Sequence, residues 1–400
     1  MNRLLVLAIV LLLGTMPALL HAQSDAEALA HARRLLEQSP LVDGHNDLPW
    51  EIRTQREHPM DVEAYDLRIT TPGHTDLARL REGRVGAQFW SIYVPGEVKD
   101  SGYARMQLEE FDIARRMIAR YPELLVPAYG ADDVEKAFRE KKIGSLLGME
   151  GGHVIENSLG ALRMYYDLGA RYLTLTHNVT LDWADAASDS AKHGGLTDFG
   201  RDVVREMNRL GMLVDLSHVS PATMSDALDV TRAPVIFSHS SARALTDHVR
   251  NVPDSILKRL PANGGVVMVT FVPGFISTAI MEHENAGNEF RRSLRSLPDS
   301  AERRAKLQEW RAAHPRPPAT IDDVADHIEH VRDIAGVDHV GIGSDFDGIT
   351  ETPVGLEDVS TFPALFAELI QRGWSDADLA KLAGGNVLRA LRAAEAVADK

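Results

Sequence analysis

Short apolar runs rich in β-branched residues recur along the chain, and longer stretches with apolar positions at helical spacing separate them. Eight such runs occupy residues 41–47, 85–94, 145–152, 172–177, 212–218, 234–240, 265–271 and 339–346. This alternation is typical of strand–helix units around a parallel sheet. Eight units predict an α/β fold of the (β/α)8 TIM-type barrel, with an open doubly wound sheet as the alternative.

Amphipathic stretches between the runs predict helices, among them residues 105–120, 198–210 and 321–335. The last of these has a clear start signal. Thr320 precedes it and Asp323 follows three residues later, which resembles a capping box. A helix is therefore expected to begin directly after Thr320.

The connection between the seventh and eighth predicted strands carries an insertion at residues 281–319. It contains eight Lys or Arg and six Asp or Glu, and it closes with the proline-rich run 315–318. This connection leaves the end of a barrel where catalytic loops lie. The insertion is therefore expected to be a lid, an oligomer contact or a solvated excursion.

The first 22 residues differ from the rest of the chain. A basic start at Arg3 leads into an apolar run over residues 4–13, and small residues follow up to Ala22. This order is typical of a secretory signal peptide over residues 1–22, cut after Ala22. An uncut anchor is the alternative, but the apolar run is short for a bilayer span. Residues 23–400 are then expected to form a single barrel domain that is exported, periplasmic or secreted, without a stable membrane span.

Charge and composition exclude several classes of protein. The chain has 43 Lys or Arg against 58 Asp or Glu, a formal net charge of -15, and no basic run. Nucleic acid is therefore not expected as a partner, and anionic membrane surfaces are poor partners. A chain of 400 residues can bury a large core without a metal, so any metal here serves chemistry. Cys is absent, so metal ligands cannot be thiolates.

Most of the predicted strands end in a residue able to bind a metal or carry a proton. These residues are His45, Asp47, Glu150, His177, His218, His239 and Asp345. The carboxyl ends of barrel strands converge on one mouth, so residues far apart in sequence are expected to share one pocket.

The residue types and spacing at these strand ends suggest a metal centre. Residues i and i+2 of a strand point to the same side, so His45 and Asp47 can bind one ion together. His218 and His239 can hold a second ion, and Glu150 has two oxygens with which to bridge both. Imidazole and carboxylate without thiolate suit zinc, with manganese or cobalt as alternatives. His153 and His193 are spare candidates, whereas the second His-x-Asp triplet, residues 74–76, is expected to be a surface or capping pair.

Two metal ions would lower the pKa of a bridging water and polarise a carbonyl or phosphoryl oxygen. The water would then act as a hydroxide nucleophile at neutral pH. Asp345, at the end of the eighth strand, is expected to take the proton from that water and pass it to the leaving group. Asp347 competes for this role, and a turn cap is the alternative for Asp345.

Seven strings of the sequence resemble one known family. They are DGHNDLPW (43–50), GMEGGH (148–153), YLTLTHN (172–178), DLSHVSPATM (215–224), PVIFSHSSAR (234–243), RNVPD (250–254) and GSDFDG (343–348). Together they resemble the membrane dipeptidase family, also called renal dipeptidase, of the metallo-dependent amidohydrolase superfamily. The match runs in order from about residue 41 to about residue 386.

The resemblance implies a zinc-dependent dipeptidase that often tolerates a D-residue on the C-terminal side of its dipeptide substrates. It implies two zinc ions, with His45 and Asp47 on one, His218 and His239 on the other, and Glu150 bridging. It further implies that His177 contacts the scissile carbonyl oxygen, that Arg250 binds the substrate carboxylate and that Asp345 shuttles the proton.

Some features depart from the mammalian members of this family. The chain has no Cys, it is expected to lack a lipid-anchor tail, and residues 271–275 differ from the mammalian pattern after the seventh strand. Substrate preference, β-lactam activity and a homodimer are therefore left open. A phosphotriesterase-like or cyclic-amide hydrolase is the second hypothesis, although such enzymes usually bridge their metals with a modified Lys. A peptide-binding or zinc-holding protein without turnover is the third.

Overall fold

The computed structural model describes residues 24–98, 102–297 and 299–398. The predicted signal peptide, residues 1–22, lies outside these ranges. Within them, helices that combine the length and the apolar character needed to cross a bilayer are absent.

Nine parallel strands are formed by the described residues. They are β1 (Leu41–Asn46), β2 (Val85–Tyr93), β3 (Leu125–Pro127), β4 (Ile143–Glu150), β5 (Ala170–Thr174), β6 (Leu213–Asp215), β7 (Val235–Phe237), β8 (Val266–Val269) and β9 (Val340–Ile342). Their order is β2-β1-β9-β8-β7-β6-β5-β4-β3, and β2 also pairs with β4. This last pairing closes eight strands into a barrel, as the sequence predicts.

One strand, β3, was not predicted from the sequence pattern. Its three residues pair only with the beginning of β4, from Leu125 opposite Ile143 to Pro127 opposite Ser145. Its apolar run covers only residues 124–126 and ends at Pro127, whereas the runs that contain the equally short β6, β7 and β9 are seven or eight residues long. β3 is therefore an addition to the edge of β4 and leaves the eight-stranded barrel intact.

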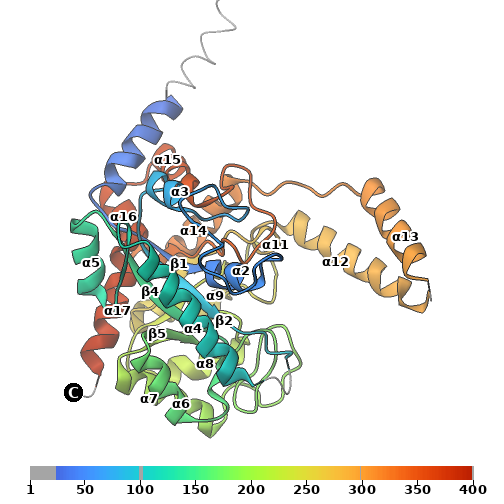
Figure 1. Cartoon of the computed structure of the whole chain (residues 1–400), viewed down its shortest axis with the longest axis horizontal. Helices are drawn as coiled ribbons and strands as arrows, with labels where there is room; N and C mark the ends of the chain where they lie inside the picture. The colour runs from blue at the N-terminus through green and yellow to red at the C-terminus, as the bar shows by residue number, and fades with distance from the viewer. Residues whose placement is uncertain (1–23, 99–101, 298, 399–400) are drawn as a thin grey trace, which may run out of the picture.

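Helices surround the strands (Figure 1). Residues 24–36 are helical. The α-helices that follow are α2 (Leu48–Thr54), α3 (Leu77–Glu82), α4 (Tyr103–Arg120), α5 (Ala131–Arg139), α6 (Leu159–Asp167), α7 (Asp198–Leu210), α8 (Pro221–Val230), α9 (Asp254–Leu257), α10 (Leu260–Asn263), α11 (Pro273–Ile276), α12 (Thr278–Ser293), α13 (Ser300–Ala313), α14 (Ile321–Ala335), α15 (Phe362–Gln371), α16 (Asp376–Ala380) and α17 (Asn386–Val397). The predicted helices correspond to α4, α7 and α14, and Thr320 and Asp323 form the predicted capping box at the start of α14.

Alternate residues of the strands serve two separate cores. In β1, Leu41 belongs to the core between strands and helices, whereas Val42 belongs to a second core inside the barrel. The second core also takes in Phe89 and Tyr172 from the strands and Leu391 from α17. Apolar side chains thus fill part of the barrel interior and pack against α17, which contacts β6, β7, β8 and β9. The polar strand ends converge on the mouth of the barrel.

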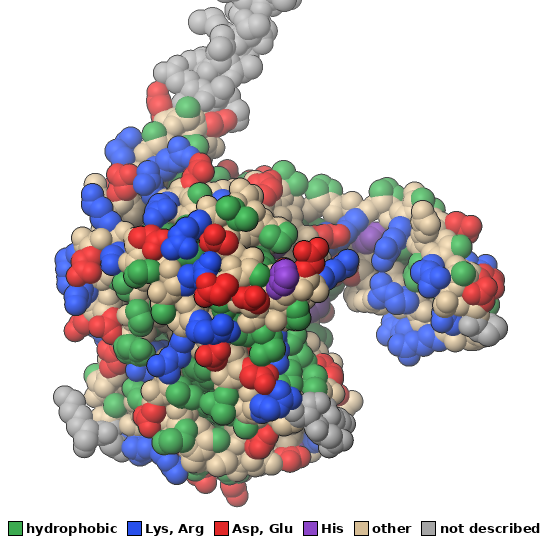
Figure 2. Space-filling model, viewed as in Figure 1, with side chains coloured by type: hydrophobic (Ala, Val, Ile, Leu, Met, Phe, Trp, Pro, Cys, Tyr) green, Lys and Arg blue, Asp and Glu red, His purple; other side chains and the backbone are tan. Residues whose placement is uncertain are grey.

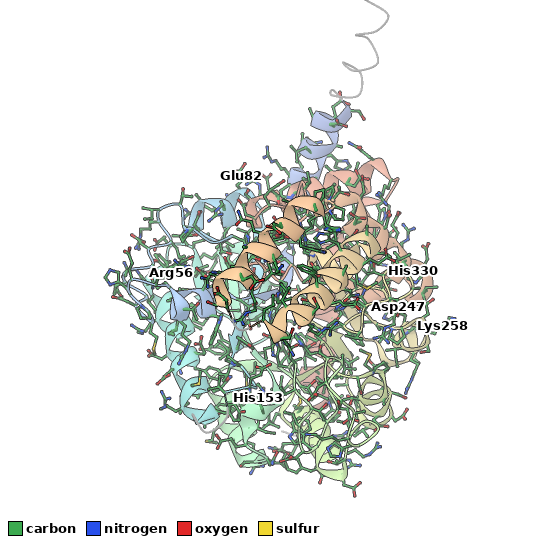
Figure 3. All side chains as sticks on the ribbon, turned by 90° about the vertical axis from the view of Figure 1, so that its right-hand side faces the viewer. Arg56, Glu82, His153, Asp247, Lys258 and His330 are labelled. Atoms are coloured by element: carbon green, nitrogen blue, oxygen red, sulfur yellow. The ribbon has the colours of Figure 1, made fainter. Side chains whose placement is uncertain are left out.

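The insertion folds into a helical hairpin made of α12 and α13, which leaves the barrel between β8 and β9. In Figure 1 the hairpin extends sideways from the barrel, and in the view turned by 90° it lies in front of the strands (Figure 3). None of the residues of α13 is buried. The insertion is thus a helical excursion, and a lid or an oligomer contact stays a prediction.

Candidate metal centre and active site

A cavity of about 570 Å³ opens at the carboxyl ends of the strands. Its lining includes most of the residues singled out from the sequence: Asp47, Glu150, His177, His218, His239, Arg250 and Asp345. His45 lies directly beneath, with its Nε2 atom 3.2 Å from Asp47 Oδ2. The fold therefore brings all eight residues together from positions spread over the length of the barrel.

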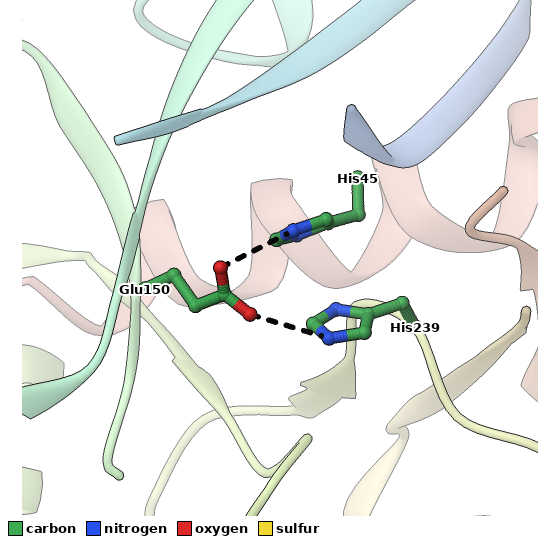
Figure 4. A group of neighbouring side chains, drawn as sticks. All are labelled: His45, Glu150 and His239. Atoms are coloured by element: carbon green, nitrogen blue, oxygen red, sulfur yellow. Dashed lines mark ion pairs between the residues drawn. The ribbon is translucent and has the colours of Figure 1, made fainter. Parts of the chain in front are cut away.

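The Glu150 carboxylate lies between two groups of side chains. Its Oε2 atom is 3.5 Å from His45 Nε2. Its Oε1 atom is 2.9 Å from His218 Nε2 and 3.4 Å from His239 Nε2. Figure 4 shows the carboxylate between His45 and His239, with one oxygen turned to each ring. The two oxygens of Glu150 thus face different imidazoles, which is the arrangement expected of a bridging ligand.

The donor atoms fit divalent metal ions. Three sets of side chains place one ligand atom each within 4.8 Å of the others. The sets are His45, Glu150 and His239; Glu150, His177 and His218; and His45, Asp47 and Asp345. Nitrogen and oxygen donors of this kind are typical of zinc and similar ions.

The surroundings of the His45 ring also fit a bound metal ion. Its Nε2 atom is buried and makes no hydrogen bond within the described residues. Burial alone would lower the pKa of His45, but the Tyr172 hydroxyl and the carboxylates of Asp47 and Glu150 raise it well above its usual range. The surroundings of this nitrogen therefore favour a positive charge, which a bound cation would supply.

His218 and His239 are held in the neutral form. Burial lowers the pKa of both rings well below the usual value for histidine. Their Nε2 atoms are only 2.9 Å apart. A neutral imidazole is the form that binds a metal ion, so both rings are prepared for that role.

Two hydroxyl groups orient rings of the candidate metal ligands. The Tyr172 hydroxyl lies 3.0 Å from His45 Nδ1 and donates to the Gly44 carbonyl at 3.3 Å. The oxygen is thus free to accept from His45 Nδ1–H, which leaves the lone pair on Nε2 facing the carboxylates. Tyr172 reaches across the barrel because Gly148 has no side chain: a Cβ there would lie 2.0 Å from the tyrosine ring.

Ser238 orients His239 in the same way. Its hydroxyl donates to Asp215 Oδ2 at 2.6 Å and lies 2.9 Å from His239 Nδ1. Because the hydroxyl proton is committed to Asp215, its oxygen accepts from His239 Nδ1–H and leaves the lone pair on Nε2. Sequence reasoning missed Tyr172, Ser238 and Asp215, although they stand in the same strings as the ligands. Only the three-dimensional arrangement links each of them to a histidine.

The backbone is strained at the ends of two strands. His218, Asp345 and Asp347 have left-handed φ angles of 68°, 69° and 63°. Such conformations cost about 1–3 kcal/mol each for residues other than glycine, and they concentrate at functional sites. The hydrogen bond from Asp345 N to the His45 carbonyl holds one of these turns in place. The strained turns end the extended segments early, so β6 and β9 are shorter than the sequence pattern predicts.

Asp345 and Asp347 have different surroundings. Asp345 Oδ1 lies 3.9 Å from His45 Nε2, and burial raises the pKa of this carboxyl well above its usual value. Asp347 instead accepts a hydrogen bond from His74 N at 2.6 Å, and burial raises its pKa to about 6. Asp345 is therefore the carboxyl group nearer to the ligand atoms. In the second His-x-Asp triplet, Asp76 caps α3, which confirms its capping role.

His177 and Arg250 complete the cavity wall. His177 Nε2 lies 3.9 Å from Glu150 Oε1, and burial lowers the pKa of this ring. The Arg250 guanidinium lies 5.1 Å from the Phe275 ring centroid, and burial lowers its pKa to about 10. Arg250 is thus charged at neutral pH, yet it has no ion-pair partner among the described residues. A buried cation of this kind is suited to a carboxylate ligand.

The two spare histidines do not join the ligand sets. His153 Nε2 lies 2.8 Å from the Val94 carbonyl, and His193 Nε2 lies 3.0 Å from the Leu181 carbonyl. Both rings are therefore held by backbone groups. Within the described residues, neither belongs to a group that could hold a metal ion.

Comparisons with known proteins agree with this geometry. The model of the family "Membrane dipeptidase (Peptidase family M19)" matches residues 29–400. Dipeptidase 3 of Mus musculus is 41% identical over 382 residues, which cover 94% of this chain and 69% of the mouse protein.

Two solved structures are also similar. The probable dipeptidase PvdM from Pseudomonas aeruginosa has a TM-score of 0.81 at 26% identity. That match covers 93% of this chain and 100% of the PvdM chain. A metallo peptidase from Rhodobacter sphaeroides, liganded with a phosphinate mimic of the dipeptide L-Ala-D-Ala, has a TM-score of 0.73 at 25% identity. That match covers 89% of this chain and 99% of the Rhodobacter chain.

The barrel and its polar mouth define a metal-dependent hydrolase. With the family match over most of its length, the chain belongs to the membrane dipeptidase family and is a metallopeptidase of that type. The fold, the enzyme class and the resemblance inferred from the sequence are thereby confirmed.

Replacing Tyr172 by Phe is expected to weaken metal binding about 10- to 100-fold, because His45 loses the oxygen that accepts from its Nδ1–H. Competition against a chelator of known affinity measures the effect. The matched control is Tyr165→Phe, which removes a buried hydroxyl that donates to the Val154 carbonyl, away from the ligands. Equal metal affinity in the two variants would show that the Tyr172 hydroxyl does not orient His45.

Proposed function

We propose that this protein is a zinc-dependent dipeptidase that carries two ions at the mouth of the barrel. His45 and Asp47 would hold one ion, His218 and His239 the other, and Glu150 would bridge them. The observation that carries this proposal is the Glu150 carboxylate, whose two oxygens face different imidazoles. Manganese or cobalt would suit the same nitrogen and oxygen donors.

The proposed substrates are dipeptides bound by their C-terminal carboxylate. Arg250 supports this because it is a buried cation without an ion-pair partner in the described part of the chain, and its planar fork meets a carboxylate in two hydrogen bonds. A D-residue on the C-terminal side is proposed on the resemblance and on the Rhodobacter relative, which was solved with a mimic of L-Ala-D-Ala.

Peptide hydrolysis needs an activated water, a stabilised carbonyl oxygen and a proton for the leaving amine. When bound, divalent ions lower the pKa of water and polarise a carbonyl oxygen. Asp345 is proposed to hold the water proton at its carboxylate and to deliver it to the leaving nitrogen. His177, whose Nε2 is 3.9 Å from Glu150 Oε1, is proposed to donate to the carbonyl oxygen as negative charge develops there.

The composition of the cavity wall weighs against the phosphotriesterase-like alternative. Among the described residues, Lys side chains are absent from the lining of this cavity, so none is available to become a modified bridging Lys. Glu150 instead occupies the position between the two ligand groups.

The proposed cellular setting rests on residues 1–22. The order of basic, apolar and small residues over 1–22 supports export and cleavage after Ala22, which leaves residues 23–400 as one barrel domain. Export would place the enzyme in a periplasm or outside the cell. A homodimer stays a prediction.

The purified protein is expected to release free amino acids from L,L and L,D dipeptides, to lose this activity on chelation and to regain it with zinc. Metal analysis should give close to two ions per chain when activity is full. Binding of two ions without hydrolysis of any dipeptide would reject the proposed function and favour a protein that holds zinc or peptides without turnover.

Replacing Asp345 by Asn is expected to reduce kcat by a factor of about 10² to 10⁴, because the amide cannot take up a proton. Metal content should stay close to that of the parent enzyme, since the five proposed ligands are intact. Asp347→Asn is the matched control, because this carboxyl group is already committed to His74. If Asp347→Asn removed activity and Asp345→Asn left it unchanged, the proton carrier would be Asp347.

A further inference from the structure

The α12–α13 hairpin is fastened to the rim of the active-site mouth. Arg316, which follows α13, forms an ion pair of 2.6 Å with Glu284 of α12 and a second ion pair with Glu351, in the segment after β9. His283 of α12 is also linked to the segment after α13, because its Nε2 lies 2.9 Å from the His314 carbonyl. The base of the hairpin is thus tied both to itself and to the barrel.

A second cavity, of about 710 Å³, lies between this hairpin and the segment 348–351. It shares three lining residues, Val272, Gly348 and Ile349, with the cavity that holds the proposed metal ligands. Gly348 stands directly beside the ligands, since a Cβ there would lie 2.2 Å from Asp47 Oδ2. The two cavities therefore share part of their walls beside the proposed metal ligands.

An aromatic wall lines part of the second cavity. Trp310 of α13 stacks on His314 with 4.6 Å between ring centroids and on Phe290 of α12 at 5.9 Å. Gly287 permits this contact between the helices, because a Cβ there would lie 3.2 Å from the tryptophan ring. Trp310 therefore joins the two helices of the hairpin and forms part of the cavity wall.

Two arginines bring positive charge to the same cavity. Arg291 of α12 and Arg311 of α13 both line it. Arg291 donates to the Asn288 side chain at 2.8 Å, and neither arginine has an ion-pair partner among the described residues. Arg316, by contrast, is already paired with two carboxylates.

This positive charge stands out on an acidic protein. The chain carries a formal net charge of -15, whereas residues 281–319 contain eight Lys or Arg against six Asp or Glu. Figure 2 shows Lys and Arg side chains gathered on the hairpin. An unpaired arginine on each helix, beside an aromatic wall, is suited to a carboxylate on a flexible extension.

We propose that the hairpin cavity is a subsite for a second carboxylate of the substrate, carried on a side chain of the dipeptide. The proposal rests on the dipeptidase function proposed above, in which Arg250 takes the C-terminal carboxylate. Arg291 and Arg311 would bind the second one. The insertion thus selects acidic dipeptides with long side chains.

The test compares dipeptides that differ only in this charge. Each dipeptide contains Ala at one position and a variable residue at the other, and both orders are tested. The variable residue is Glu or Gln in one pair of substrates. In a second pair it is succinyl-lysine or the amide of succinyl-lysine, which has the same length without the charge. At one of these positions, kcat/KM is expected to be about tenfold higher for the acid, as one charge-assisted hydrogen bond would give. The preference should weaken at high salt, because the arginines are exposed.

The double variant Arg291→Gln, Arg311→Gln is expected to lose the preference for the acid and to keep its activity on alanyl-alanine. The matched control is the double variant Arg292→Gln, Arg304→Gln, which removes the same charge from the same two helices outside the cavity lining. The control should keep the preference, which separates a local contact from the general field of the hairpin.

The outcomes distinguish this inference from the function on which it rests. Hydrolysis of alanyl-alanine with equal kcat/KM for acid and amide at both positions would overturn the subsite and leave the dipeptidase in place. Equal loss of the preference in both double variants would also overturn it. Failure to hydrolyse any dipeptide would reject the proposed function itself, and the subsite with it.

Discussion

The interaction on which the active site depends is that of one buried carboxylate with imidazoles on two sides. Glu150 projects from the end of β4 between His45 on one side and His218 and His239 on the other. Burying charged and polar groups at this density is costly unless positive charge compensates them. The raised pKa of His45 reflects this demand, which a divalent cation would satisfy. Other residues around the mouth hold these side chains in place.

Several local features of the barrel hold these side chains in place at the mouth. Left-handed turns at His218 and Asp345 end the strands abruptly and direct their side chains to the mouth. Tyr172 and Ser238 orient two of the histidine rings, and Gly148 leaves room for the tyrosine ring. The left-handed turns lower the stability of the fold locally, and the large apolar cores of the barrel compensate for that cost.

Much of the fold and of the site could be predicted from the sequence, because the barrel places strand ends together. Once eight strands are recognised, His45, Glu150 and Asp345 must share one mouth, whatever their separation in the chain. The helical hairpin was harder to predict, because α13 has no buried residue and α12 buries only Ile280, so neither helix shows a clear apolar periodicity. The roles of Tyr172 and Ser238 were out of reach for another reason. An interior tyrosine or serine has the same pattern whether it packs or orients a ligand.

The bridging role of Glu150 can be tested by a crystal structure of the zinc-loaded protein with anomalous data at the zinc edge. Two peaks per chain are expected, one beside His45 and Asp47 and one beside His218 and His239, with an oxygen of Glu150 bound to each ion. A single ion, or two ions of which one does not touch Glu150, would contradict the bridging role of this carboxylate.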